Sequence, residues 1–456
     1  MTKRLASGLL PLFLLWTGCT VGPNYKRPVV TVPPVYRGEN AEQLANQSAP
    51  SLGDEKWWLV FHDTELQKLI HVALQQNFDV RIAASRILQA EAQLGITRAD
   101  QFPNITGGPS YTAQKIPLFK YQAAQAQASL SWIPDFWGRY RRATEAARAN
   151  LLASEWNKRT VIETLVSNLA AAYFQLREFD LELDISQRTL VSRRNSLQLT
   201  ETLANGGATS LLDVKQAQQL VETAAAAIPD IQRQITETED AINLYLGASP
   251  NDVTRGKPLT EQSLPATIPT GLPSRLLERR PDIRQAEQSL VAANAQIGVA
   301  RAQLFPEISL TGSGGIASLA LSNVIGVYTA TPTVTEPIFN AGQLRSNVRL
   351  AEAGRQEAVL TYHQAIYTAL RQVSDSLAGY QRFREFREHQ ESLTAAARDA
   401  SGLSEMRYKG GVTSYLEVLT NETNYFSAEL NLARARLSER LSLVQVYNAL
   451  GGGWEQ

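Results

Sequence analysis

The sequence is poor in the residues from which disulfides, metal sites and redox centres are built. It contains one cysteine, Cys19, and four histidines scattered along 456 residues. A single cysteine excludes an internal disulfide, and separated histidines do not predict a metal site. Met406 is the only methionine after Met1, so a site for a soft metal ion is not indicated either. We therefore expect no metal and no cofactor.

The sequence also lacks net charge. Its 44 Lys and Arg residues balance 44 Asp and Glu residues. Proteins that bind nucleic acid usually carry a basic excess, so we expect no nucleic-acid partner. The sequence has no glycine-rich phosphate loop with a lysine and no HExxH motif. We predict no catalytic residues and do not expect an enzyme.

Long apolar runs are missing as well. Lys3 and Arg4 precede an apolar stretch from Leu9 to Trp16, which is too short for a membrane helix. Residues 1–18 therefore match an export signal. No later run reaches the length of a membrane helix. If the mature chain crosses a membrane, we expect it to do so with β-strands.

Two stretches rich in proline and polar residues divide the rest of the chain. Residues 19–62 are predicted to form an extended tether, and residues 251–273 a linker. The stretches between them, 63–250 and 274–451, are similar in sequence, and 452–456 form a short tail.

The similarity indicates a tandem duplication. Residues 79–105 align with 282–308 with 12 identities in 27 positions. With one further residue of offset, GGATSLLDV at 206–214 matches GGVTSYLEV at 410–418. This spacing is far above the 20–50 residues of solenoid repeats. We therefore expect two large, quasi-equivalent units in one chain.

Each repeat begins with a helical stretch followed by two strand-like segments. The first helix, 64–100, is expected to end before Pro103. The strands are predicted at about 104–113 and 124–134, and at about 307–316 and 327–338 in the second repeat. They alternate apolar with small polar residues. This pattern is typical of transmembrane barrel strands, and equally of half-buried strands in soluble proteins.

A very long helix is predicted next in each repeat. Residues 138–205 have no proline or glycine between their ends, which gives a helix of roughly 100 Å. Leucines recur at every seventh position from Leu169 to Leu197, as in a coiled coil. The second copy spans 342–409 and is free of proline but interrupted by Gly354, Gly379 and Gly402. A double glycine follows each long helix, Thr209 or Thr413 is a candidate N-cap, and a shorter helix returns, interrupted in the first repeat by Pro229.

Several motifs together resemble a known family. They are LLWTGCTVGPNYKRP near the start, EPIFNAGQLR, GGVTSYLEVL and the ending NALGGGW. Over essentially its whole length the chain resembles the TolC family of outer-membrane efflux factors, in particular the lipidated members that serve resistance–nodulation–division (RND) pumps.

The resemblance implies a mainly α-helical fold with a β part. Three chains would form an α-barrel of coiled-coil helices topped by a 12-stranded transmembrane β-barrel. It also implies an outer-membrane location with a long periplasmic part, contact with outer-membrane lipid, and a lipid on Cys19. The implied partners are two further copies of the chain, a periplasmic membrane-fusion adaptor and an inner-membrane RND pump.

The resemblance further implies two sites at the double-glycine turns. The adaptor would contact Gly206, Gly207, Ala208, Thr209 and Ser210, and Gly410, Gly411, Val412, Thr413 and Ser414. Ordinary helix-end chemistry is the alternative explanation for these glycines. A constriction would involve Leu416, Glu417 and Thr420, where family members often have an aspartate at the position of Thr420. Glu417 could equally lie in a subunit interface.

The sequence thus predicts a passive outer-membrane channel that conducts small toxic compounds delivered by a pump and an adaptor. Two alternatives remain open at this point. One is an outer-membrane duct of a type I protein secretion system, and the other is a periplasmic coiled-coil scaffold without a pore.

Overall fold

The structure, a computed structural model, describes residues 20–37, 50–117, 119–262, 264–265, 268–319 and 323–454. The chain divides into two compact units. Unit 1 comprises Met1–Val30, of which residues 20–30 are described, Ala84–Asn157 and Asp282–Ala365. Unit 2 comprises Thr31–Ala83, Lys158–Pro281 and Ile366–Gln456. Both units take segments from both repeats.

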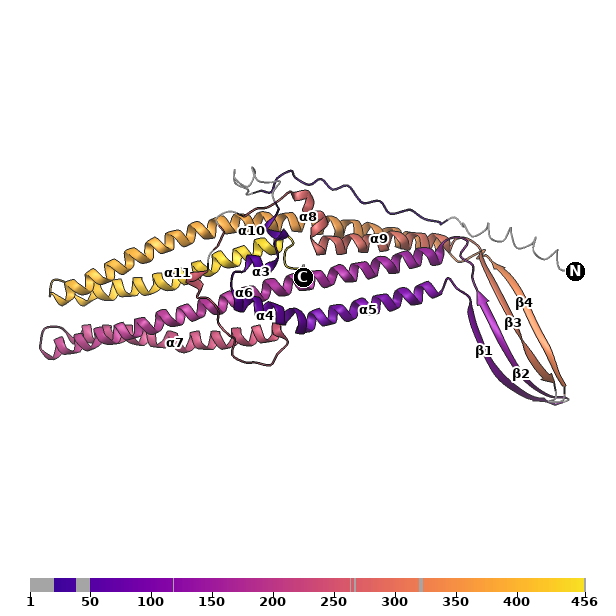
Figure 1. The fold of residues 1–456 in the computed structure, drawn as a ribbon, viewed down its shortest axis with the longest axis horizontal. Coiled ribbons are helices and arrows are strands. Elements are labelled where there is room, and N and C mark those ends of the chain that lie inside the picture. The colour runs from indigo at the N-terminus through magenta and orange to yellow at the C-terminus, as the bar shows by residue number, and fades with distance from the viewer. Residues whose placement is uncertain are drawn as a thin grey trace. The chain divides into compact units, whose positions relative to one another are not determined.

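The element order repeats along the chain (Figure 1). The first repeat has α4 (Thr64–Gln76), α5 (Phe78–Ala99), β1 (Asn104–Ile116), β2 (Phe119–Trp132), α6 (Arg139–Asn205) and α7 (Leu211–Leu246). The second has α8 (Pro273–Arg279), α9 (Pro281–Ala302), β3 (Glu307–Leu319), β4 (Asn323–Thr335), α10 (Gln343–Lys409) and α11 (Tyr415–Ala449). Short helices η2 (Leu52–Asp54), α3 (Trp57–Val60) and η3 (Leu259–Glu261) lie in the predicted tether and linker. No helix in the described ranges is both long enough and apolar enough to cross a membrane.

Unit 1 contains one antiparallel sheet with the strand order β1-β2-β3-β4. The central pairing joins β2 of the first repeat to β3 of the second, with Leu130 opposite Gly312. Within each repeat the two strands form a hairpin, in which Ile105 pairs with Leu130 and Ile308 with Val334. The duplication therefore produces one continuous sheet whose outer strands, β1 and β4, each have a free edge.

The register places most apolar and polar residues on opposite faces of the sheet, with exceptions near the hairpin ends at Gln122, Ile325 and Val327. Leu310 lies opposite Pro332 and Ile308 opposite Val334, whereas Thr311 lies opposite Thr331. Because side chains alternate between faces along a strand, matched alternation in four strands gives one apolar and one polar face. The apolar face carries Ile105, Tyr111, Leu130, Leu310, Ile316, Tyr328 and Val334. This extends the predicted alternation from single strands to the whole sheet.

The strands are longer than predicted, or displaced along the chain. β1 and β3 continue three residues beyond the predicted ends, to Ile116 and Leu319. β2 and β4 start earlier than predicted, at Phe119 and Asn323, and end earlier, at Trp132 and Thr335. Hairpin pairing explains the difference, because each strand extends as long as its partner supplies hydrogen bonds.

The two long helices are confirmed. α6 and α10 each span 67 residues without a break. Within unit 2 the heptad residues Ile162, Leu169 and Leu176 of α6 are at most 4% exposed. Farther along, Leu190 and Leu197 are only half-buried. The heptad pattern therefore marks the packed side of α6, and its packing loosens toward the double-glycine turn.

The predicted first helix is in fact two helices. α4 ends at Gln76 and α5 begins at Phe78, because the Asn77 side chain accepts hydrogen bonds from the amides of Asp79 (2.8 Å) and Val80 (3.1 Å) and caps α5. The amide nitrogen of the same side chain donates to the Tyr245 carbonyl at the end of α7, at 3.0 Å. The end of α4 and the end of α7 therefore meet.

Two further expectations for the returning helices are wrong. α7 continues through Pro229, which is exposed, so the carbonyl left without a donor can bond to water. The N-cap residues are Ser210 and Ser414 rather than the preceding threonines.

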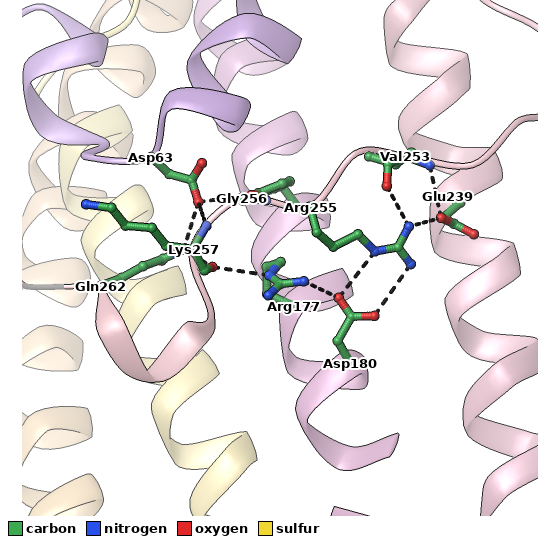
Figure 2. A network of polar contacts seen from close by, with 10 residues as sticks. Asp63, Arg177, Asp180, Glu239, Val253, Arg255, Gly256, Lys257 and Gln262 are labelled. Carbon is green, nitrogen blue, oxygen red and sulfur yellow. Dashed lines mark hydrogen bonds and ion pairs between the residues drawn. The ribbon is translucent and has the colours of Figure 1, made fainter. Parts of the chain in front are cut away.

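The predicted linker is held firmly along its first half by a polar network in unit 2 (Figure 2). The Asp63 carboxylate accepts from the Lys257 amide at 3.0 Å, and the Tyr173 hydroxyl accepts from the Gly256 amide at 2.9 Å. Arg255 forms ion pairs with Asp180, at 3.4 Å, and with Glu239. Residues 253–257 are therefore an ordered strap rather than a free linker.

Candidate functional site: the double-glycine turns

Each long helix ends in the same backbone motif. After α6, the Ala208 amide donates to the Leu203 carbonyl at 2.8 Å and the Gly207 amide to the Ala204 carbonyl at 3.0 Å. After α10, the amides of Val412 and Gly411 repeat both bonds at 3.0 and 2.9 Å. This pair of bonds defines the Schellman motif, whose penultimate residue has a positive φ. Gly207 and Gly411 have φ of 72° and 70°, so glycine is required there for backbone reasons alone.

Acidic side chains close each turn. In the first, Asp213 accepts from the Thr209 hydroxyl and from the Ser210 amide at 3.1 Å, while Ser210 accepts from the Asp213 amide at 3.3 Å. This reciprocal arrangement is a capping box. Burial alone would raise the pKa of Asp213, but the hydrogen bonds from Thr209 and Ser210 lower it below the usual aspartate value. Asp213 is therefore ionised at neutral pH at the positive end of the α7 dipole.

The second turn repeats part of this chemistry. Thr413 donates to the Glu417 side chain, and Arg407 forms an ion pair with Glu417 at 3.3 Å. Ser414 makes no side-chain cap. The Glu417 carboxylate is thus engaged by its own turn.

The structure brings the two turns together within unit 2. The Tyr408 hydroxyl lies 3.5 Å from the Thr209 hydroxyl of the other turn. The rings of Tyr408 and Tyr415 pack edge to face with centroids 5.2 Å apart. Tyr415 and Val418 of α11 form a buried cluster with Ala217 of α7. The sequence motifs did not indicate a role for these tyrosines. The one available signal was that Tyr415 differs from Leu211, the residue at the equivalent position of the first repeat.

The residues predicted to contact a partner are mostly exposed. Of the ten turn residues, only Thr209 and Thr413 are half-buried. Four apolar side chains beside the glycines are left uncovered by the described residues, namely Leu211, Leu212, Val412 and Leu416, whose exposed fractions are 71%, 65%, 70% and 57%. An apolar cluster with this exposure at the end of a helix pair is typical of an interaction surface.

The predicted constriction residues lie on the first turns of α11. Leu416 is exposed, and its carbonyl accepts from the Thr420 hydroxyl at 2.9 Å. Thr420 is exposed as well. Glu417 makes the contacts described above, which favour a role in closing the turn. Their part in a constriction stays a prediction.

The predicted lipidation residue, Cys19, lies outside the described residues, but the residues directly after it contact the segment before α6. In unit 1 the Val21 amide donates to the Trp137 carbonyl at 3.0 Å. A Cβ on Gly138 would lie 2.7 Å from the Thr20 side chain. The tether therefore begins against the segment between β2 and α6.

The tether is then fixed along unit 1. The Asn294 side chain donates to the Pro23 carbonyl at 2.9 Å, and Arg27 pairs with Glu287 at 2.9 Å. A Cβ on Gly298 would lie 2.8 Å from the Val21 carbonyl oxygen. Composition predicted an extended tether, and within unit 1 its residues 20–27 lie along α9 and the start of α6.

Comparisons with known proteins agree with this architecture. A family model described as outer membrane efflux protein matches residues 69–248 and 272–452. The probable efflux pump outer membrane protein TtgC of Pseudomonas putida is 35% identical, over 100% of this chain and 96% of its own length. The cation efflux system protein CusC of Escherichia coli is 34% identical, over 98% and 99%. The open-state MtrE outer membrane channel of Neisseria gonorrhoeae matches with a TM-score of 0.88 and 30% identity, over 96% and 99%.

The fold and these matches define the class of protein. The sheet of hairpins, the paired long helices and the tandem repeats are those of an outer-membrane channel. The chain belongs to the outer membrane efflux protein family. Its two matched regions coincide with the two repeats identified in the sequence, so each repeat is one copy of the family's unit.

Proposed function

We propose that this protein is the outer-membrane channel of a tripartite efflux system. It passively conducts small toxic compounds that an inner-membrane RND pump and a periplasmic adaptor deliver to it. Three copies form the channel, and the adaptor binds the double-glycine turns. The names of relatives that act on organic solvents and on cations support a channel that does not itself choose its cargo.

The open sheet is the observation that carries this proposal. β1 and β4 each leave one edge unpaired, and nearly every residue of β4 is exposed. A lone four-stranded sheet with an uncovered apolar face is unstable in water, and its open edges are not tolerated in lipid. Pairing β4 of one copy with β1 of the next removes both problems. Three copies related by a threefold rotation axis form a closed ring of twelve strands.

Features of the double-glycine turns support the proposal that the adaptor binds there. Small residues at the Schellman motifs allow a second helix to approach the backbone, and the apolar side chains of Leu212 and Val412 provide contact area. A lipid on Cys19 fits the same scheme. The next residue, Thr20, lies against Gly138, in the segment through which the chain passes from β2 into α6.

The first experiment measures oligomeric state and conductance. The purified protein in mild detergent should have three times the mass of one chain, and it should form conducting pores in planar bilayers. A monomer without conductance would contradict both the ring and the channel, and would favour a scaffold without a pore.

The second experiment tests the adaptor surface in cells. A deletion strain should become hypersensitive to drugs while protein secretion continues, and the intact gene should restore resistance. Leu212→Asp and Val412→Asp should assemble normally but fail to restore resistance. Thr236→Asp, an exposed position farther along α7, is the matched control and should restore it. Normal resistance with both turn variants would refute the adaptor assignment, and a secretion defect would favour the protein-export alternative.

A further inference from the structure

A pocket rich in arginine lies in unit 2, away from the double-glycine turns. Its volume is about 240 Å³, and it lies between the linker and helices α10 and α11. The charged residues that line it are Arg384, Arg387, Glu391, Arg436, Glu439 and Arg440. We call it the arginine pocket. Four guanidinium groups face two carboxylates, so the lining carries an excess of positive charge.

The two carboxylates of the lining are already engaged. Arg387 pairs with Glu391 and with Glu439, both at 2.7 Å. Arg436 also contacts Glu391, at 3.3 Å. Outside the lining, Glu388 lies 3.4 Å from Arg384 and from Arg387. These ion pairs neutralise the charge of Arg387 and part of the charge of Arg384 and Arg436. None of them includes Arg440.

Arg440 is the unusual member of the pocket. Its side chain donates to three backbone carbonyl groups, those of Arg436 at 2.9 Å, Leu259 at 2.5 Å and Gln262 at 3.1 Å. The residue is 5% exposed, and its Nε has no hydrogen-bond partner. No carboxylate in the described ranges pairs with it.

This environment is costly for a cation. Burial lowers the pKa of Arg440 to about 10; Glu439 opposes this effect, while the charges of Arg436 and Arg387 add to it. A buried charge is tolerated when it is paired and hydrogen-bonded, and carbonyl dipoles supply only part of this. Arg440 therefore lines a cavity with surplus positive charge and carries a buried charge that an anion in this cavity would compensate.

We propose that the arginine pocket binds a small oxyanion, a phosphate or carboxylate group, with Arg440 as its buried anchor and Arg384 at its rim. Guanidinium groups match the oxygen geometry of both anions and bind them with charge-assisted hydrogen bonds. A volume of 240 Å³ holds such a group together with several water molecules, each of which takes about 30 Å³. Because Arg440 also bonds the carbonyls of Leu259 and Gln262, a bound anion stabilises the linker. This site is independent of the channel function.

Titration calorimetry on the detergent-purified protein provides the test, with inorganic phosphate as the probe and chloride at matched ionic strength as the blank. Saturable binding of one phosphate per chain is expected. Arg384→Gln should weaken it about tenfold, the effect of one lost charge-assisted hydrogen bond. Arg440→Gln should abolish it.

Arg233→Gln is the matched control. Arg233 is an exposed arginine on α7 with two acidic partners, Asp230 and Glu237, and its loss should leave phosphate affinity unchanged. Because Arg384 is partly exposed, its variant should fold even if Arg440→Gln does not. Crystals soaked in selenate should show an anomalous peak within reach of Arg440.

Competition by acetate separates the two sources of the oxyanion. If acetate displaces phosphate, the pocket accepts carboxylates, and if it does not, the site is specific for the tetrahedral anion. Absence of saturable phosphate binding overturns the proposal. Equal affinity in the Arg384→Gln, Arg233→Gln and unmodified proteins also overturns it, since binding would then be a general effect of charge.

Discussion

Glu178 on α6 allows a sharp prediction about pH and stability. Its side chain is 1% exposed, and Gln175 donates to it at 3.0 Å. Burial, together with the nearby charge of Glu182, raises the pKa of Glu178 from 4.5 to about 8. Glu182 is paired with Arg434 of α11 at 2.9 Å. Glu178 therefore keeps its proton at neutral pH, in hydrogen-bond contact with the Glu182 side chain.

This proton makes stability depend on pH. The folded chain holds it up to about pH 8, whereas the unfolded chain loses it above about pH 4.5. The stabilising contribution is therefore complete below pH 4.5 and is lost as the pH rises toward 8. With ~1.4 kcal/mol for each pH unit, the free energy of unfolding should fall by about 3 kcal/mol between pH 5 and pH 8 from this group alone.

Glu178→Gln isolates this contribution, because the amide copies the protonated acid and does not titrate. The assay is thermal unfolding in detergent at pH 5, 6, 7 and 8, followed by tryptophan fluorescence. The variant should match the unmodified protein at pH 5 and unfold about 3 to 6 °C higher at pH 8. Asp184→Asn removes an exposed carboxylate on the same helix and should leave the pH profile unchanged. Equal slopes for Glu178→Gln and the unmodified protein would refute the reasoning.

Three further predictions follow from particular contacts. Ser210→Ala, which breaks a capping box, should cost ~1 kcal/mol, whereas Ser414→Ala should have almost no effect on the unfolding temperature. Gly298→Ala should loosen the tether and expose residues 20–27 to protease, whereas Gly95→Ala at the matching helix position, where a Cβ meets nothing within 4 Å, should stabilise the helix by up to ~1 kcal/mol. Asp63→Asn should leave the buried Tyr173 hydroxyl and the Lys257 amide with a weaker acceptor and cost about 2 kcal/mol, seen as faster hydrogen exchange in residues 253–257. Equal results for the two serine variants or for the two glycine variants, or unchanged exchange in the strap, would contradict the corresponding contact.

The sequence by itself determined the repeats, the two 67-residue helices and the glycines of both turns. These features depend on local rules, which a single chain segment obeys wherever it lies. The run of α6 without proline or glycine continues as a helix, and the proline-free run of α10 does so despite Gly354, Gly379 and Gly402. A positive φ at a Schellman motif selects glycine. The strands were located with errors of two to five residues at most of their ends, because strand ends depend on the partner strand rather than on the segment itself.

Only the tertiary structure decided which residues from distant segments meet. It pairs β2 with β3 across the repeats, and it brings Tyr408 of the second turn beside Thr209 of the first. It fixes residues 253–257 of the predicted linker as a strap through Asp63 and Arg255, and it buries Arg440 with no carboxylate partner among the described residues. No local pattern marks such residues, because an isolated arginine or aspartate in a sequence looks the same whether it is solvated or buried. Burial and partners are properties of the packed chain, and they set both the pKa of Glu178 and the chemistry of the arginine pocket.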